Sequence, residues 1–247
     1  YSVVGGWIIS YLVKAASGSF NTADVTVLGS MFSEFISSAG MPIFYHAIFM
    51  LTTLGIVIGG IQNGIEKYSK IMMPSLFVIL VLVVLRSVTL DGAMEGIRFF
   101  LTPDFSKING GVILSALGQV FFSLSLGMGC MITYGSYLSK EENIPQSSMI
   151  IPLIDTGVAL LAGLAILPAV FAFGFSPSAG PGLLFITLPA VFSKMPMGSL
   201  VGVAFFVLAL FAAVTSSISL LEVCVSYAVD EWKWTRKKAT YLISALI

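Results

Sequence analysis

The residues best suited to chemistry lie in the segment 118–129, which reads GQVFFSLSLGMG. Ser123, Ser125, Gly127 and Gly129 stand in the middle of an apolar stretch that continues on both sides. Each glycine weakens a helix by about 1 kcal/mol relative to alanine, and serine hydroxyls can bond carbonyls that a break leaves free. A break would expose backbone oxygens and half-helix ends, with which transporters bind ions and substrates. The spacing equally fits close packing of small residues between intact helices.

A second polar cluster, AAVTSSIS, occupies residues 212–219 of another apolar stretch. Helical spacing puts Thr215 and Ser219 on one face, with Ser216 beside them. Neutral oxygen ligands of this kind suit a hard cation such as Na⁺. The alternative is hydrogen bonding between helices, which is worth about 0.6 kcal/mol per pair.

Two acidic residues, Asp155 and Glu222, also lie inside apolar stretches. A charged aspartate at the bilayer centre costs about 2.5–3.5 kcal/mol on insertion scales, so such residues are candidates for function. Asp155 is close enough to one end of its stretch to reach headgroup water, and Glu222 has the alternative of being protonated and merely hydrogen-bonded. His46, the single histidine, is interpreted as an interfacial residue.

The sequence gives no indication of an enzyme. It contains no nucleotide-binding motif, no His/Cys metal cluster and no nucleophile–base pair, and Gly127 and Gly129 follow no strand that would make a phosphate loop. Cys130 and Cys224 both lie in apolar stretches and are expected to be small buried residues without a disulfide. No cofactor is expected.

The composition indicates a membrane protein. Of 247 residues, 57% are hydrophobic and only 10% are charged, and the mean hydropathy is +1.00. A water-soluble domain has about 25% charged residues, so lipid must cover much of this surface. The formal net charge is zero, which gives no electrostatic reason to expect a nucleic-acid partner.

The elements that must position these residues are membrane-spanning helices, because stretches such as 76–85 are apolar on every side, whereas barrel strands alternate. Five full spans are predicted, at 42–61, 71–90, 112–138, 148–173 and 199–229. Partial spans at 1–16 and 239–247 flank them, which predicts an internal piece of a longer protein.

The connecting segments alternate in charge. Basic residues favour the cytoplasmic side for the loops 62–70, 139–147 and 230–238, and the last of these carries most of the evidence. The remaining segments, 17–41, 91–111 and 174–198, are predicted to be external. Short surface helices are predicted within them at 91–104 and 182–194.

At these residues the sequence resembles the neurotransmitter:sodium symporter family, in its bacterial, amino-acid-transporting form. The resemblance extends along nearly the whole chain and is most specific in the sixth- and eighth-helix motifs. The matching segments are Tyr1–Trp7 with the third transmembrane helix, Lys67–Pro74 with the fifth, Gly118–Tyr137 with the broken sixth, Phe185–Phe192 with the external helix before the eighth, and Val214–Ser217 with Asp230–Glu231 in the eighth.

The resemblance implies an all-α fold of two inverted five-helix repeats around a midplane site. The chain, 1–247, would be a single transmembrane domain fragment from the third helix to the start of the ninth. The first helix supplies half of both sodium sites in this family, so the chain alone is not expected to transport.

The resemblance also implies roles for individual residues. The substrate would be contacted by Tyr1, Phe122, Ser123, Ser125, Met128, Ser216, Ser219 and Leu220. The sodium ligands would be Ser123, Asp155, Ala212, Thr215 and Ser216. The gates would be formed by Tyr1, Phe122, Tyr137 and Asp230, with Gly127 and Gly129 as hinges.

The function so implied is sodium-coupled symport of an amino acid by alternating access, in a multi-pass protein of a bacterial inner membrane. Asp155 stands where the family often has asparagine, and its charge predicts transport that does not require chloride. Met128 replaces an aromatic residue of some members and predicts an apolar or aromatic substrate. Two alternatives remain: a proton-coupled transporter with a related inverted-repeat fold, and a membrane scaffold or sensor that does not transport.

Overall fold

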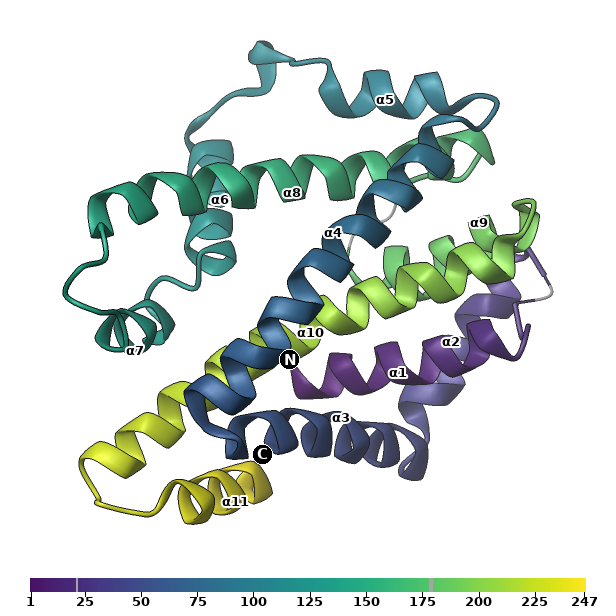
Figure 1. The fold of residues 1–247 in the computed structure, drawn as a ribbon. Coiled ribbons are helices and arrows are strands. Elements are labelled where there is room, and N and C mark those ends of the chain that lie inside the picture. Colours follow the sequence, from purple (N-terminus) through teal and green to yellow (C-terminus); the bar gives the residue numbers. More distant parts are fainter. Residues whose placement is uncertain (21, 178–179) are drawn as a thin grey trace.

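The structure is a computed structural model that describes residues 1–20, 22–177 and 180–247, and every regular element in these ranges is a helix. The elements are α1 (Ser2–Ala16), α2 (Val25–Ser37), α3 (Gly40–Ile58), η1 (Ile61–Glu66), α4 (Lys67–Val88), α5 (Ala93–Leu101), η2 (Phe105–Lys107), α6 (Gly110–Ser123), α7 (Cys130–Ser136), α8 (Ile144–Ala172), η3 (Leu183–Thr187), α9 (Leu188–Lys194), α10 (Gly198–Asp230) and α11 (Arg236–Leu246). Figure 1 shows α10 running through the middle of the molecule.

Among the described residues, four helices are long and apolar enough to cross a membrane: Gly40–Ile58, Ile61–Val88, Ile144–Ala172 and Gly198–Asp230. The 33 residues of α10 correspond to a length of about 50 Å, well beyond the hydrocarbon thickness of about 30 Å. It packs against α1, α3, α4, α9 and α11, so it is the central support of the fold. The remaining predicted span, 112–138, is divided into α6 and α7.

The prediction of a loop at 62–70 was wrong, because this segment is helical. The π-helix η1 continues directly into α4, and the turn after α3 is confined to Gly59 and Gly60. Gly60 has φ of +80°, and a side chain on Gly64 would overlap the carbonyl oxygen of Ile56. Glycine at positions 60 and 64 allows a tight turn. The charged residues that suggested a loop lie on the exposed face of a helix instead.

The predicted external loop 17–41 contains a helix, α2, that the prediction missed. Asp24 caps it by accepting a hydrogen bond of 2.8 Å from the backbone N–H of Thr26. This bond also holds the pKa of the Asp24 carboxyl below its usual range. Leu28, Phe32 and Phe35 are buried at i, i+4 and i+7. The external helices predicted at 91–104 and 182–194 are present as α5 and as η3 with α9.

The core is built around aromatic side chains between α1, α2, η3 and α10. Tyr11 is fully buried, and its ring packs against the rings of Phe20, Phe32, Phe35, Phe185 and Phe206. Such ring pairs contribute about 0.5–1.5 kcal/mol beyond their area burial. This rigid cluster fixes α1, and therefore the position of Tyr1 at its start.

Two small residues let α1 approach α3 closely. A Cβ atom on Gly6 would lie 2.7 Å from the backbone nitrogen of His46, and the ring of Phe49 fills the space beside Gly5. Small residues at helix contacts are typical of membrane bundles, where close packing replaces the hydrophobic driving force.

We expect Gly6→Ala to destabilise the protein by about 1–3 kcal/mol, because backbone atoms cannot move aside as a side chain can. The measurement is the thermal unfolding midpoint of the full-length protein in detergent. Gly55→Ala is the matched control, since nothing lies within 4 Å of its Cβ position. It should be neutral or stabilise the helix by up to about 1 kcal/mol. Equal midpoints for the two variants would contradict the close approach of α1 and α3.

Candidate functional site

The predicted interruption of the helix around Ser123–Gly129 is confirmed. Helix α6 ends at Ser123 and α7 begins at Cys130, with residues 124–129 in turns between them. Ser125, Gly127 and Gly129 have φ of 53°, 78° and 79°. Left-handed backbone costs glycine nothing, which explains two of the three positions. The ends of both half-helices therefore leave backbone groups without helical partners inside an apolar part of the chain.

Ser123, the last residue of α6, is held by Asp155 of α8. Its hydroxyl oxygen lies 2.7 and 2.8 Å from the two carboxylate oxygens, to which it donates a shared hydrogen bond. Within the residues that the structure describes, no Lys, Arg or His pairs with Asp155. The structure thus brings two predicted site residues together at the start of the break. They contribute three oxygen atoms, one from Ser123 and two from Asp155, and the carboxylate is not paired with a cation.

Two aromatic residues that were predicted to form a gate stack next to the break. The rings of Tyr1 and Phe122 stack with centroids 6.2 Å apart and planes 10° apart. Tyr1 also lines a cavity of about 330 Å³ together with Met128, Ser217 and Leu220. Three of the predicted substrate residues, Tyr1, Met128 and Leu220, therefore share one cavity.

The hydroxyl cluster of α10 brings a second group of oxygens together. The hydroxyl of Thr215 lies 3.0 Å from the carbonyl oxygen of Ala212 and donates to it, and it lies 3.0 Å from that of Phe211. Ser216 follows on the same helix and is partly exposed. The break meets α10 at Leu220, across the cavity, and at Val223, whose Cγ1 lies 3.0 Å from the Cβ position of Gly129. These contacts lie about one to two turns beyond Thr215 and Ser216.

Two residues near the cavity make contacts that the sequence did not indicate. The hydroxyl of Ser219, a predicted substrate contact, lies 2.9 Å from that of Tyr134 on α7. Ser217, which was not predicted, is buried and accepts a hydrogen bond of 3.2 Å from Thr53 of α3. Its proximity to Thr215 in sequence was the available signal.

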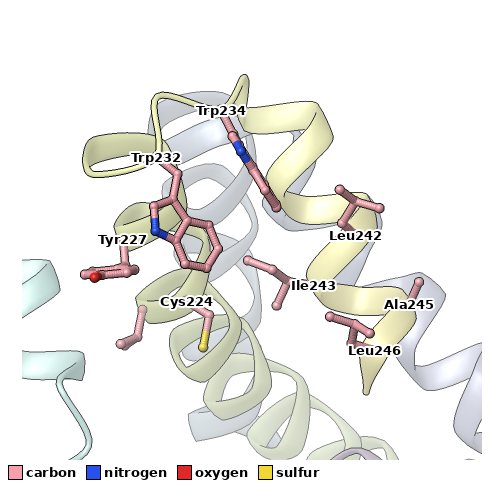
Figure 2. A pocket seen from close by; sticks show the side chains of 9 residues that line it. Cys224, Tyr227, Trp232, Trp234, Leu242, Ile243, Ala245 and Leu246 are labelled. Atoms are coloured by element: carbon pink, nitrogen blue, oxygen red, sulfur yellow. The ribbon is translucent and has the colours of Figure 1, made fainter.

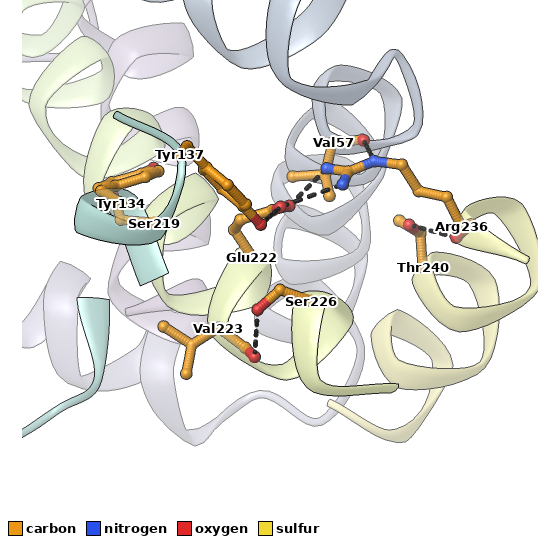
Figure 3. Close-up of polar contacts among 9 residues, drawn as sticks. All are labelled: Val57, Tyr134, Tyr137, Ser219, Glu222, Val223, Ser226, Arg236 and Thr240. Carbon is orange, nitrogen blue, oxygen red and sulfur yellow. Dashed lines mark hydrogen bonds and ion pairs between the residues drawn. The ribbon is translucent and has the colours of Figure 1, made fainter. Parts of the chain in front are cut away.

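Glu222 is fully buried and forms an ion pair with Arg236, as Figure 3 shows. The guanidinium contacts both carboxylate oxygens, with Nη1 at 3.0 Å from Oε1, and its Nε donates to the carbonyl oxygen of Val57. Tyr137 donates to the same Oε1 at 2.6 Å. Arginine is always charged, and two-point contact suits an ionised carboxylate. The alternative of a merely protonated Glu222 is therefore not supported.

This network joins helices that are far apart in sequence: α3, α7, α10 and the start of α11. Tyr137 was predicted to belong to an inner gate, and the structure places it on Glu222. Asp230, the other predicted inner-gate residue, lies outside the network, and within the described residues its carboxylate has no ion pair. Arg236 was missed, although a buried acid requires a cation and a basic run begins at that residue.

Comparison with known proteins gives consistent matches. The model of the sodium:neurotransmitter symporter family matches residues 15–247. The sodium-dependent transporter YhdH of Bacillus subtilis (strain 168) is 47% identical over 247 residues, which is 100% of this chain and 55% of the relative. A sodium-dependent transporter of Haemophilus influenzae is 43% identical over 98% of the chain and 54% of its own length.

Among solved structures, the crystal structure of MhsT in complex with L-phenylalanine matches with a TM-score of 0.89 and 44% identity, over 100% of this chain and 56% of that one. The chain thus spans about half the length of the relatives that it matches.

We expect Glu222→Gln to destabilise the protein by about 3–5 kcal/mol, because it leaves Arg236 without its anion at a largely buried site. A double-mutant cycle with Arg236→Gln, read from unfolding of the full-length protein, measures the coupling directly. The exposed pair Glu66–Lys70 is the matched control, at 48% and 72% side-chain exposure, and should couple by less than about 1 kcal/mol. Coupling of Glu222 no larger than in the control would rule out the buried ion pair.

Proposed function

Since the chain belongs to the sodium:neurotransmitter symporter family, we propose that the protein carries an amino acid across a cell membrane together with Na⁺, by alternating access. The family consists of transporters, not enzymes. The observation that carries this proposal is the break between α6 and α7, where the hydroxyl of Ser123 meets the carboxylate of Asp155, next to Phe122, whose ring stacks on Tyr1 at one wall of the cavity. Broken helices of this kind provide ion and substrate sites in transporters.

We assign Na⁺ as a co-transported ion to two groups of oxygens. Ser123 and Asp155 would bind one ion, and a cation there would offset the carboxylate charge. The carbonyl of Ala212 and the hydroxyls of Thr215 and Ser216 would bind the other. The oxygens of Thr215 and Ala212 lie 3.0 Å apart, which is close enough to share one cation of this size. Missing ligands would come from segments that this chain does not include.

The substrate would lie in the cavity between the break and α10. Its carboxylate would meet the Tyr1 hydroxyl and the backbone N–H groups at the break, which carry partial positive charge. Its side chain would contact Ser125, Met128 and Leu220, with Ser216 and Ser219 farther along α10. The apolar character of Met128 and Leu220 supports an apolar or aromatic amino acid. The complex of MhsT with L-phenylalanine supports the same class.

The gates would lie on either side of the cavity. The stacked rings of Tyr1 and Phe122 would form the outer gate, and Tyr137 with Asp230 would take part in the inner one. Gly127 and Gly129, already in left-handed conformations, would act as hinges between the half-helices. Ion and substrate would each stabilise the same conformation, which couples their binding. The basic segment 230–238 would face the cytoplasm, and the relatives in Bacillus and Haemophilus support a bacterial cell membrane.

Asp155 supports transport without chloride. Its carboxylate has no cationic partner among the described residues, so it can supply the fixed negative charge near the first ion site that a bound anion would otherwise provide.

The proposal predicts that the full-length protein in proteoliposomes accumulates labelled leucine or phenylalanine only when a Na⁺ gradient is imposed. Thr215→Ala should raise the Na⁺ concentration for half-maximal uptake by about tenfold or more, because it removes one ligand oxygen. Ser75→Ala is the matched control, because this partly exposed hydroxyl bonds the carbonyl oxygen of Ile71 within its own helix. Tryptophan, leucine and alanine as competitors define the substrate class.

Uptake driven by a proton gradient without Na⁺ would favour the proton-coupled alternative. Absence of Na⁺-dependent substrate binding would favour a scaffold or sensor. Stronger competition by small polar amino acids than by leucine or tryptophan would refute the apolar pocket.

We expect wild-type uptake to be unchanged when chloride is replaced by gluconate, and Asp155→Asn uptake to require chloride. The amide keeps the size of the side chain but removes its charge, which a bound chloride then restores. The measurement is Na⁺-driven uptake as a function of chloride concentration, with Asp91→Asn on the exposed turn before α5 as the control. A wild-type protein that needs chloride would refute this role of Asp155.

A further inference from the structure

An apolar groove lies between the end of α10 and α11, and it shares Val223 and Cys224 with the cavity described above. It has a volume of about 630 Å³ and is shown in Figure 2. Its lining consists of Val223, Cys224, Tyr227, Trp232, Trp234, Leu242, Ile243, Ala245 and Leu246. Both indoles lie near the connecting loop, whereas Cys224 and Leu246 lie farther along the groove. The groove therefore has an aromatic end and an aliphatic end.

A basic residue stands at the aromatic end. Lys238 precedes Leu242 by one helical turn, so it lies on the face of α11 that carries Leu242, Ala245 and Leu246 into the groove. Its Nζ lies 4.7 Å from the centroid of the Trp234 ring. The groove thus begins with a cation above an indole and continues as hydrocarbon.

The dimensions and the aromatic residues match one leaflet of a bilayer. Lys238 to Leu246 spans about 12 Å along the helix, close to the half-thickness of about 15 Å of a hydrocarbon core. Trp232 packs against both Trp234 and Tyr227, at centroid distances of 5.1 and 5.6 Å. Tryptophan and tyrosine concentrate where headgroups meet hydrocarbon, so this end lies at the membrane surface.

The charges at this surface favour an anion at Lys238. Arg236 is neutralised by Glu222, and the Nζ of Lys233 bonds the carbonyl oxygen of Asp230. The exposed acids, Asp230 and Glu231, precede the loop, whereas Lys237 and Lys238 stand together in the first turn of α11. Within the described residues neither lysine has an ion pair. Lys238 therefore presents an unpaired cation at the mouth of the groove, with Lys237 beside it on the neighbouring face of α11.

We propose that this groove binds an anionic phospholipid of the cytoplasmic leaflet, with the phosphate at Lys238 and one acyl chain along Leu242 and Leu246. A cation and aromatic rings above a hydrocarbon-lined groove match the order of parts in a phospholipid. An apolar protein segment would leave Lys238 without a partner. Trp232 and Trp234 line the groove but not the cavity, Lys238 lies over Trp234, and none of the three is among the proposed transport residues, so the test does not depend on transport activity.

The test uses the full-length protein in vesicles that contain brominated acyl chains, which quench tryptophan fluorescence on contact. The signal of Trp232 and Trp234 is obtained as the difference from the variant with both changed to phenylalanine. We expect brominated phosphatidylglycerol to quench this signal several-fold more than brominated phosphatidylcholine does. Lys238→Gln should reduce the preference by about fivefold, the effect of one basic residue at an anionic surface. Lys238→Arg should restore it.

Lys140→Gln, in the exposed turn between α7 and α8, is the matched control and should leave the preference unchanged. Equal quenching by both lipids, or a preference unaltered by Lys238→Gln, overturns the proposal. No quenching by either lipid also overturns it, because the groove is then covered by protein, either another segment or a second copy of the chain.

Discussion

A peptide carbonyl or N–H group in the hydrocarbon core of a membrane has no water to bond, so a helix that stops there must be given partners. This constraint governs the region between α6 and α7. Gly127 and Gly129 adopt left-handed backbone conformations without strain, and the hydroxyl of Ser123 donates a hydrogen bond to the carboxylate of Asp155 on α8. The groups that remain free are backbone oxygens and N–H groups of opposite polarity, which suit a cation and a carboxylate respectively. The ion and substrate binding proposed for this protein is thus a consequence of an incomplete helix.

The same rule applies to the buried charge of Glu222. A carboxylate without exposure is stable only with a cation and further hydrogen bonds, and Arg236 and Tyr137 supply them. Because these partners come from α11 and α7, satisfying one charge fixes the relative positions of three helices. Arg236 also bonds the end of α3 through Val57, which ties a fourth element to the same point. The ion pair and its hydrogen bonds therefore define one arrangement of these helices, which nonpolar packing between apolar helices alone does not.

Apolar length and composition were sufficient to predict the long helices, and the Ser/Gly segment was sufficient to predict the break, because both signals are local. The loop 62–70 was mispredicted because lysines on the exposed face of a helix resemble a polar turn. Helix α2 was missed because its apolar residues resemble a connecting segment in sequence. The tertiary contact that buries them, such as the stacking of Phe32 on Phe185, is not visible in the sequence. The partnership of Glu222 with Arg236 depends on the fold of the loop between them, and a single sequence does not state which of four nearby basic residues turns inward.

The two halves of the interrupted helix are attached to different neighbours. Helix α6 has no buried residue of its own in this chain and is tied to α8 through Ser123, whereas Tyr134 and Tyr137, one turn apart, fasten α7 to α10. A displacement of α8 relative to α10 is therefore concentrated in the segment 124–129 instead of being spread along a rod. In the proposed function, an ion held by Ser123 and Asp155 would move with α8 and an ion held by Thr215 would move with α10, so the distance between the two ions would change with the relative position of these two long helices.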